Sequence, residues 1–432
     1  MSVELPDYAA VQDYLFGLKA RGMKFGIDRM RLLATAIGHP ERAVPVIHLA
    51  GTNGKGSTAA MLDSILRAAG SKVGLYTSPH LVRLGERVQV NRTILSEEEI
   101  TAYTRELLPV AERLAANDPD DHPSFFEFMT AMAFLQFARQ DCDVAVAEVG
   151  LGGELDATNI VQPLVTAITS IGLDHCEMLG YTHAEIAQAK AGILKPGVPV
   201  VLGRLPAEAE AVVRARAQAL GCPLTSVREV FGNELAEYPH TSLEGDYQRW
   251  NAATATLIAR TLPPEWGVDE AAIELGLKTS FWPARWQRLE LGQRTLILDA
   301  SHNPEGAESL AVNLARLVIK LGHHPVIVVG CLGAARAGAL MDVVARFARE
   351  IHLVVPDQAR ACSHASLRQF LPADYPGTVR DTTVKHLFEG DGLAHLPAQE
   401  TVVVTGSIYL AGEVMAQLKP DLGPGEGRLQ DF

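Results

Sequence analysis

The stretch HLAGTNGKGST, from His48 to Thr58, carries the residue types of a phosphate-binding loop. A strand-like run precedes it, its glycines let backbone N–H groups turn toward an anion, and a helix is expected to begin at Ser57. Lys55 would neutralise the β- and γ-phosphates of a nucleotide. The usual loop has Ser or Thr directly after the lysine, whereas here Gly56 intervenes. The alternative is a glycine-rich turn without a ligand, but Lys55 and the strand–loop–helix context favour a nucleotide site.

Polar side chains follow or end three other strand-like runs. Ser78 follows KVGLYT, Glu148 ends DVAVAE, and His175 follows LVTAITSIGLD. Because ligands of an open parallel sheet bind beyond the carboxyl ends of its strands, these side chains should converge near Lys55. A carboxylate at the end of an apolar strand is the usual magnesium-side partner of a phosphate loop. Each residue also has a purely structural explanation, such as a turn at Ser78 before Pro79 or an ordinary loop position for His175.

Short apolar runs alternate with helical patterns along the chain, and such runs are typical of parallel strands covered on both faces. The expected strands are 44–50, 143–149, 164–171, 198–203, 295–300, 324–330, 351–356 and 401–406. Two helical patterns, 57–70 and 207–221, end in glycine. The alternation predicts an α/β fold with mostly parallel sheets.

A domain boundary is expected near residues 278–294, KTSFWPARWQRLELGQR, after which a fresh strand–loop–helix series begins. We place a larger first domain at 1–285 and a smaller second domain at 286–432, in line with common domain sizes. Lys190 lies late in the helical segment AQAKAGILKPG, and by itself it would be interpreted as a solvated surface charge.

Composition narrows the function classes. The chain has 432 residues, 47% of them hydrophobic, and a formal net charge of −13, which argues against nucleic-acid binding and favours small-molecule substrates. Five scattered cysteines without a C-x-x-C pair indicate reduced thiols rather than disulfides or a zinc site. With no signal-peptide pattern and no apolar run of ~20 residues, we expect a cytoplasmic protein that does not associate with membranes. We also expect a monomer.

The motifs together resemble the folylpolyglutamate synthase/dihydrofolate synthase family, part of the wider Mur ligase group. They occur in family order from about residue 20 to 415. The matching stretches are HLAGTNGKGST, TSPHL, SFFEFMTAMAF, EVGLGGELDATN, ITSIGLDHCEMLG, AKAGILKPG, LEGDYQRWNA, LDASHNP and TGSIYLAGEV.

The resemblance implies an ATP-binding first domain with the phosphate loop and a smaller Rossmann-like second domain, with the active site between them. It also implies the reaction: ATP phosphorylates a carboxylate to an acyl phosphate, and the amino group of glutamate attacks it to form an amide. Lys55 and magnesium, with two ions expected, would neutralise phosphate charge during the transfer.

The resemblance assigns roles to residues by motif. Around the nucleotide it implies Gly54, Lys55, Gly56, Ser57, Asn251, Arg285, Asp299 and His302. The implied metal set is Ser78, Glu148 and His175, and the implied catalytic set is Lys55, Glu148, His175 and Lys190. Lys190 matches a lysine that is carbamylated in this family, which turns a cation into a carboxylate-like group. Without the resemblance, Asn251 would be interpreted as a helix-start amide and Arg285 as a linker charge.

For the pteroate substrate the resemblance implies contacts at three places. They are Gly22, Met23, Lys24 and Phe25; Ser124, Phe125, Phe126 and Glu127; and Leu155, Asp156 and Ala157. Aromatic rings beside a carboxylate suit a flat pterin, which needs stacking and hydrogen bonds at its edge. The alternative for SFFEFMTAMAF is a buried helix face.

The chain departs from the family pattern at four positions. Glu154 replaces a common arginine, which would be unfavourable near anionic substrates unless it points away or pairs with a cation. Ala189 replaces a frequent glutamate beside Lys190, Ala284 replaces a glycine, and Ser301 stands where alanine is usual.

We expect a bifunctional enzyme that adds L-glutamate to dihydropteroate, to tetrahydrofolate (poly)glutamate, or to both. One alternative is a Mur-type ligase with a different carboxylate acceptor, although only about fifty residues precede the phosphate loop, too few for a separate uridine-nucleotide-binding domain. A second is a switch protein that hydrolyses ATP without ligation.

Overall fold

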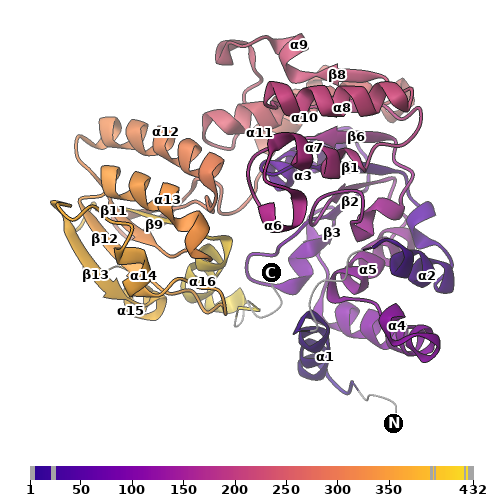
Figure 1. Ribbon diagram of the computed structural model, residues 1–432, viewed down its shortest axis with the longest axis horizontal. Helices are drawn as coiled ribbons and strands as arrows, with labels where there is room; N and C mark the ends of the chain where they lie inside the picture. Colours follow the sequence, from indigo (N-terminus) through magenta and orange to yellow (C-terminus); the bar gives the residue numbers. More distant parts are fainter. Residues whose placement is uncertain (1–4, 21–25, 390–392, 394–395, 423–424, 427–432) are drawn as a thin grey trace.

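Two β-sheets, each covered by helices, form two lobes that lie side by side (Figure 1). The computed structural model describes residues 5–20, 26–389, 393, 396–422 and 425–426. Within this part of the chain the first sheet has eight strands in the order β4-β3-β2-β5-β1-β6-β7-β8, and the second has six in the order β13-β12-β11-β14-β10-β9. The alternating apolar runs therefore predicted the α/β class correctly.

The first sheet is parallel from β2 to β8, and β3 and β4 add an antiparallel edge. Its strands are β1 (Val46–Ala50), β2 (Val73–Tyr76), β3 (Val88–Val90), β4 (Thr93–Ile94), β5 (Val144–Glu148), β6 (Val165–Ile168), β7 (Val200–Leu202) and β8 (Leu224–Ser226). The central strand β1 is fully buried and pairs with β5 on one side and β6 on the other, so the ends of these three strands meet at one edge.

Helices cover both faces of this sheet. Successive side chains of a strand point to opposite faces, so each face presents side chains to its own layer of helices. In β5, Val144 and Val146 pack under one helical layer, and Ala145 and Ala147 pack under another. The first layer consists of α3 (Lys55–Ala68), α10 (Asp246–Thr261) and α11 (Glu270–Thr279). The opposite layer has α1 (Tyr8–Ala20), α2 (Asp28–Ala36), α4 (Glu97–Asn117) and α5 (Phe125–Arg139) at one end, and α7 (His183–Ala191) and α8 (Ala207–Ala219) at the other.

The second sheet is parallel except for β9, which pairs antiparallel with β10. Its strands are β9 (Gln287–Leu291), β10 (Arg294–Leu298), β11 (Val326–Val329), β12 (Glu350–Val354), β13 (Thr378–Thr382) and β14 (Thr401–Thr405). One face packs against α12 (Pro304–Leu321) and α13 (Ala334–Phe347), and the other against α15 (Val384–Phe388) and α16 (Ile408–Leu418). The described residues also form three short α-helices, α6 (Cys176–Leu179), α9 (Val227–Phe231) and α14 (His364–Arg368), and several 3-10 turns.

The helix after the phosphate loop begins two residues earlier than predicted, at Lys55 rather than Ser57. Gly54 takes a left-handed conformation, with φ of 84°, as its N-cap, so the chain can turn into the helix one residue before Lys55. The boundary between residues 285 and 286 stays a prediction, and the two sheets occupy residues 46–226 and 287–405.

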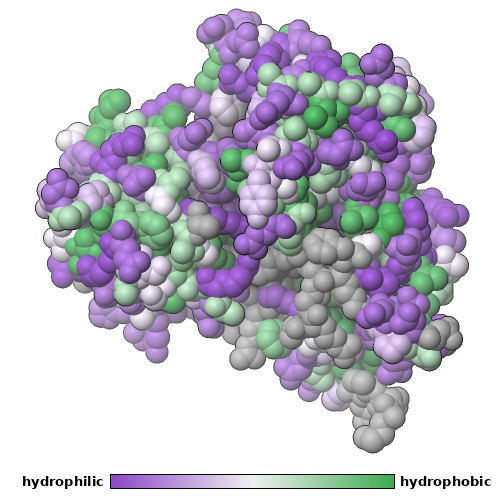
Figure 2. All heavy atoms as spheres, in the orientation of Figure 1, coloured by the Kyte–Doolittle hydropathy of each residue, from purple (hydrophilic) through white to green (hydrophobic). Residues whose placement is uncertain are grey.

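No helix in the described part of the chain combines the length and apolarity that a bilayer crossing requires. On the face shown in Figure 2, hydrophilic residues cover much of both lobes and hydrophobic ones occur in small groups among them.

Candidate active site

A cavity of about 760 Å³ lies between the two lobes. Its first wall includes the phosphate loop, the segments that follow β2, β5, β6 and β7, and the first two turns of α10. Its second wall consists of the segments that follow β10, β11, β12 and β14. Both sheets therefore direct the carboxyl ends of their strands at one cavity, the position where open α/β sheets bind ligands.

The phosphate loop is held so closely that a Cβ on any of three of its glycines would clash, and at Gly56 it would lie 2.9 Å from Nε1 of Trp282. A Cβ on Gly51 would lie 2.0 Å from Oγ1 of Thr169, and one on Gly54 would lie 2.3 Å from Oδ1 of Asn251. Asn251, in α10, thus lies directly beside the loop. Because α3 begins at Lys55, the unpaired N–H groups of its first turn face the cavity, which makes an anion site.

Two lysines donate to the same backbone carbonyl in this loop. Nζ of Lys55 lies 3.0 Å from the oxygen of Gly51, and Nζ of Lys190, from α7, lies 2.9 Å from it. Lys190 is only 4% exposed. Burial, helped by the charge of Lys55, lowers the pKa of Lys190 to about 7, against the opposing effect of Asp174 and Asp156. A large share of its amine is therefore neutral near pH 7.

Glu148, at the end of β5, lies next to both Ser78 and Lys55. The backbone N–H of Ser78 donates to Oε2 of Glu148 at 3.3 Å, and Nζ of Lys55 lies 3.8 Å from Oε1. Burial raises the pKa of Glu148, while Lys55 and the Ser78 N–H oppose that rise. The structure thus gathers three of the predicted residues at one strand edge.

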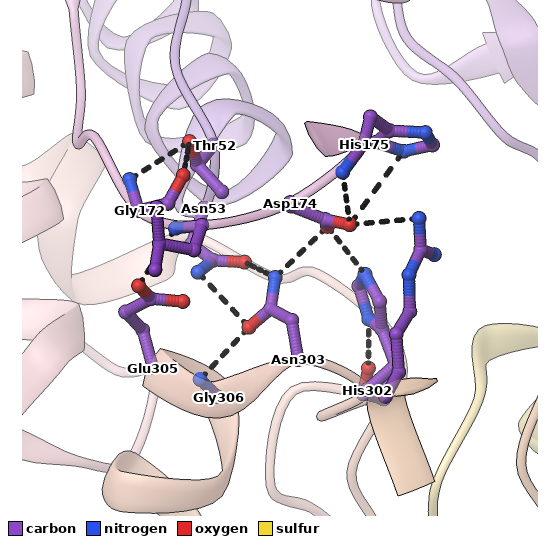
Figure 3. A network of polar contacts seen from close by, with 12 residues as sticks. Thr52, Asn53, Gly172, Asp174, His175, His302, Asn303, Glu305 and Gly306 are labelled. Carbon is purple, nitrogen blue, oxygen red and sulfur yellow. Dashed lines mark hydrogen bonds and ion pairs between the residues drawn. The ribbon is translucent and has the colours of Figure 1, made fainter. Parts of the chain in front are cut away.

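His175 lies in the same cavity but in a second cluster, around Asp174 (Figure 3). Burial, together with the charges of Arg336, His302 and Lys55, lowers the pKa of His175 to about 4 against the opposing charge of Asp174, so its imidazole is neutral near pH 7. Within the described residues, no group of three or more His, Cys, Asp or Glu side chains is arranged to hold a metal ion. A metal set of Ser78, Glu148 and His175 stays a prediction.

Asp174 joins the two lobes and is not among the residues predicted from the sequence. Its Oδ2 accepts from Nδ2 of Asn303 at 3.0 Å and lies 3.5 Å from Nε2 of His302, while Nη2 of Arg336 lies 2.8 Å from Oδ1. Burial alone would raise the pKa of Asp174, but the hydrogen bond from His302 and the charges of His302, His175 and Arg336 outweigh burial and lower it. The only sequence signal was a carboxylate directly before His175.

Asn53 and Asn303 form a second link across the cavity, also absent from the predicted set (Figure 3). Nδ2 of Asn53 donates to Oδ1 of Asn303 at 3.2 Å, and Nδ2 of Asn303 donates back at 3.0 Å. Oδ1 of Asn303 also accepts from the N–H of Gly306, which caps the N-terminus of α12. The carboxylate of Glu305 accepts from the N–H of Leu173 at 2.9 Å, which places the start of this helix against the first lobe.

The other residues predicted to contact the nucleotide all line the same cavity. They are Gly56, Ser57, Asn251, Arg285, Asp299 and His302. Asp299 follows β10, and its carboxylate accepts from the hydroxyl of Ser301 at 2.5 Å and from the hydroxyl of Tyr247 at 3.4 Å. Ser301 stands where alanine was the expected residue, and its hydroxyl therefore holds the Asp299 carboxylate in position. Ala284 takes a left-handed conformation with φ of 54°. Glycine, the residue common in the family at this position, adopts that conformation without strain.

The described residues among those predicted to contact pteroate do not line this cavity. Ser124 caps α5 and Glu127 caps it in return. Phe125 is buried, with the guanidinium of Arg87 5.3 Å from its ring centre, and Asp156 is buried and accepts from the N–H of Leu151 at 3.0 Å. The remaining members are Phe126, Leu155 and Ala157, of which Leu155 is exposed. Gly22, Met23, Lys24 and Phe25 lie outside the described residues.

Glu154 has an exposed side chain and does not line the cavity. Its backbone N–H donates to the carbonyl of Ala189 at 3.0 Å, and its carbonyl accepts from Nδ2 of Asn159 at 3.0 Å. The residue thus positions the loop through its backbone, next to the turn of α7 that carries Lys190. The negative charge of the Glu154 carboxylate is therefore exposed to solvent.

Comparison with known proteins agrees with this architecture. A model of the Mur ligase middle domain matches residues 49–200. The dihydrofolate synthase/folylpolyglutamate synthase of Bacillus subtilis (strain 168) is 35% identical over 440 residues, which cover 95% of this chain and 99% of the relative. The structure of E. coli FolC in complex with DHPP and ADP is 31% identical with a TM-score of 0.82, over 96% of this chain and 98% of that chain. The folylpolyglutamate synthase of Thermotoga maritima is 30% identical with a TM-score of 0.81, over 98% of both chains. This chain therefore belongs to the dihydrofolate synthase/folylpolyglutamate synthase family, within the Mur ligases.

Proposed function

We propose that this protein adds L-glutamate to dihydropteroate and to tetrahydrofolate (poly)glutamate in an ATP-dependent ligation. The observation that carries the proposal is the convergence of Lys55, Lys190 and Glu148 on the phosphate loop, inside the cavity that both sheets face. The Bacillus subtilis relative carries both synthase names, which supports a bifunctional enzyme.

The reaction proceeds in two steps. The carboxylate of the acceptor attacks the γ-phosphorus of ATP, which forms an acyl phosphate and releases ADP. The amino group of glutamate then attacks the acyl carbon, so an amide forms and inorganic phosphate leaves. Lys55 and the N-terminus of α3 stabilise the negative charge on the transferring phosphoryl group, since both are positive and face the cavity.

Magnesium fits the donors present, as an ion shared with the nucleotide. Mg²⁺ is usually bound by one or two carboxylates together with phosphate oxygens and water. Glu148 supplies one buried carboxylate. Ser78 supplies a hydroxyl beside it, because the backbone N–H of Ser78 donates to that carboxylate. The neutral imidazole of His175, in the cluster around Asp174, would be a ligand for a second ion. When bound, the metal neutralises phosphate charge.

Carbamylation of Lys190 is also part of the proposal. Carbon dioxide reacts with a neutral amine, and burial keeps much of the Lys190 amine neutral near pH 7. A bond forms between Nζ and the carbon of carbon dioxide, one N–H bond breaks and its proton is released, so the carbamate carries one negative charge. That charge would relieve the repulsion between Lys190 and Lys55, whose ammonium groups share one carbonyl acceptor.

The proposal includes a cytoplasmic monomer whose partners are ATP, L-glutamate and a pterin-containing acceptor. The test is a screen of acceptors in which ADP release is coupled to a signal and the product mass is measured. With magnesium and L-glutamate present, dihydropteroate and tetrahydrofolate should each give a product heavier by one glutamate. ADP release that does not depend on acceptor or glutamate, without a mass change, would overturn the proposal.

A further inference from the structure

The chain that follows α16 in the second lobe turns back onto the first lobe. A 3-10 turn, Pro420–Leu422, comes directly after this helix. Nε of Arg83 donates to the carbonyl of Leu422 at 2.5 Å, and Nη2 of Arg83 donates to the carbonyl of Asp421 at 3.0 Å. Arg83 belongs to residues 77–87, which connect β2 to β3 and are called here the β2–β3 segment. The two lobes are therefore also joined by residues that do not line the cavity.

The carboxylate of Glu426 accepts hydrogen bonds from two separate parts of the first lobe. Its Oε1 accepts from the hydroxyl of Tyr8 and from Nε2 of Gln12, both in α1 and both at 2.6 Å. Its Oε2 accepts from the backbone N–H of Leu84, and the backbone N–H of Glu426 donates to the carbonyl of Val82 at 2.9 Å. Because both carboxylate oxygens are in use, Glu426 holds α1 and the β2–β3 segment at a fixed spacing.

A buried histidine continues this contact toward the cavity. Nε2 of His80 lies 3.1 Å from the carbonyl oxygen of Glu426, and Nε of Arg87 donates to Nδ1 of His80 at 3.0 Å. Burial and the charge of Arg87 lower the pKa of His80 well below its usual range, against the opposing effect of the Glu426 carbonyl, so the imidazole is neutral. Since Nδ1 accepts from Arg87, the ring proton is on Nε2, which donates to that carbonyl. Glu426 thus fixes the tautomer and the orientation of His80.

His80 lies two residues after Ser78, which faces the proposed reaction. Ser78 and Pro79 line the cavity, and the N–H of Ser78 donates to Oε2 of Glu148 at 3.3 Å. The part of the β2–β3 segment that reaches the cavity is therefore anchored at His80, by a residue of the other lobe. Loss of that anchor would let Ser78 move relative to Glu148.

We propose that Glu426 is a positioning residue for the ligation, which holds Ser78 beside Glu148 through His80. Glu426 does not line the cavity, so it acts through the β2–β3 segment and not on a substrate. Because Glu426 follows the second lobe in the chain, the same contact couples the position of Ser78 to the packing of the lobes. A displacement of ~1 Å near the reacting groups can lower turnover about 100-fold, so an anchor outside the cavity can control the rate. This inference rests on the proposed ligase function.

The first experiment compares Glu426→Ala with Glu426→Gln, well below the unfolding midpoint of each variant, where lost stability alone leaves kcat unchanged. In Glu426→Ala we expect kcat to fall about tenfold or more and KM for ATP to stay within about twofold, because no contact of Glu426 involves the phosphate loop. Glutamine keeps an acceptor for the Leu84 N–H, and its amide can donate to Tyr8 and to a reoriented Gln12, so Glu426→Gln should recover most of the loss. Glu389→Ala is the control, because Glu389 is exposed in the second lobe and does not line the cavity.

The second experiment removes a donor on the first lobe. Tyr8→Phe should lower kcat in wild type but should lower it no further in Glu426→Ala, because both changes break the same contact. Tyr238→Phe is the matched control, since its hydroxyl donates to the carbonyl of Gly232 at 2.9 Å, away from the cavity. It should leave kcat unchanged in both backgrounds. A wild-type kcat in Glu426→Ala, or fully multiplicative effects of Tyr8→Phe and Glu426→Ala, overturns the inference.

Hydrogen exchange measured without substrates separates this inference from the ligase proposal. Peptides that cover residues 79–87 should exchange faster in Glu426→Ala than in wild type, since the acceptor of the Leu84 N–H is lost, and peptides that cover the phosphate loop should not change. If wild type forms no amide product but this difference is seen, the reaction is wrong and the anchor stands. If wild type forms the amide and Glu426→Ala turns over at the wild-type rate, the positioning role is wrong and the reaction stands.

Discussion

The ammonium groups of Lys55 and Lys190 donate to one acceptor, the carbonyl oxygen of Gly51, at 3.0 Å and 2.9 Å. Lys55 belongs to the helix that follows the phosphate loop, and Lys190 comes from α7 on the opposite face of the sheet. Lys55 also donates to the carbonyl of Thr52 at 3.3 Å and lies 3.8 Å from Oε1 of Glu148, and Lys190 is the more deeply buried of the two lysines. The site therefore holds a lysine whose positive charge is unfavourable in the folded protein.

Lys190→Met should make stability less dependent on pH while abolishing turnover. The folded-state pKa of Lys190 is about 7, against 10.5 normally, so between these values the unfolded chain binds a proton that the folded chain does not. Stability of the wild type therefore rises with pH through this window, by up to ~1.4 kcal/mol per unit from this group, and is lowest below it. Chemical denaturation at several pH values measures the slope, and turnover should fall ~100-fold or more.

Lys320→Met is the control for this prediction, because Lys320 is exposed on α12. It should leave both the slope and the turnover unchanged. An equal slope in wild type and Lys190→Met would show that the Lys190 pKa is not lowered by folding.

Carbamylation of Lys190 should be visible directly. Protein incubated with carbon-13 bicarbonate above pH 7, where the neutral amine dominates, should show a carbamate carbon resonance that Lys190→Met lacks and Lys320→Met retains. The signal should weaken as the pH falls below 7, because the protonated amine does not react. Absence of a signal from wild type at every pH, with activity intact, would contradict the carbamate.

Local patterns predicted the parts of the site that lie within one sheet. The rule that ligands bind beyond strand ends placed Ser78 and Glu148 beside Lys55, and the hydrogen bonds agree. Sequence patterns did not predict the contacts that depend on how the two lobes pack against each other. Asp174 meets Arg336 only through that docking, and no feature of either segment marks the other as a partner.

The elements that the sequence did not predict have a similar explanation. The strands that were not predicted are β3, β4, β8, β9 and β13. Four of them, β4, β8, β9 and β13, are the edge strands of the two sheets and are only partly buried, and β3 is a three-residue strand beside β4, so all five lack the continuous apolar runs of the central strands. The start of α3 at Lys55 depends on the left-handed conformation of Gly54, which the sequence allows but does not specify.

Asn303→Ser should separate helix capping from the contact between the lobes. A serine hydroxyl can replace the cap to Gly306 but is too short to reach Asn53 and Asp174. Asn303→Ala should lose about 1 kcal/mol of stability through the missing cap, and Asn303→Ser only a few tenths. Both should lower kcat to a similar extent because both lose the same contacts across the cavity. Thermal unfolding measures the loss of stability, and steady-state kinetics measure the loss of kcat. Full activity in Asn303→Ser would show that the contacts of Asn303 across the cavity do not support turnover.

Gly54→Ala should weaken nucleotide binding, whereas Gly70→Ala should not. Both glycines are left-handed, with φ of 84° and 95°, so each alanine costs ~1 kcal/mol of stability through backbone strain. Only at Gly54 does the new Cβ meet another group, 2.3 Å from Oδ1 of Asn251, while nothing lies within 4 Å at Gly70. Denaturation should give a larger loss of stability in Gly54→Ala, which adds the contact with Asn251 to the backbone strain, and ATP titration should show weaker binding in Gly54→Ala alone. Equal ATP affinity in both would mean that the loop tolerates displacement of Asn251.

Glu154→Arg restores the residue common in the family and should change little. The side chain is exposed and outside the cavity, and the contact it makes to Ala189 uses its backbone, which any residue retains. We expect KM values for ATP and acceptor within about twofold of wild type. Asp156→Asn is the contrasting variant in the same loop, because its buried carboxylate accepts from the N–H groups of Leu151 and Thr158, and one amide oxygen cannot replace both acceptors. It should lose about 1–3 kcal/mol of stability. A tenfold fall in acceptor KM for Glu154→Arg would instead show that residue 154 faces the acceptor during turnover.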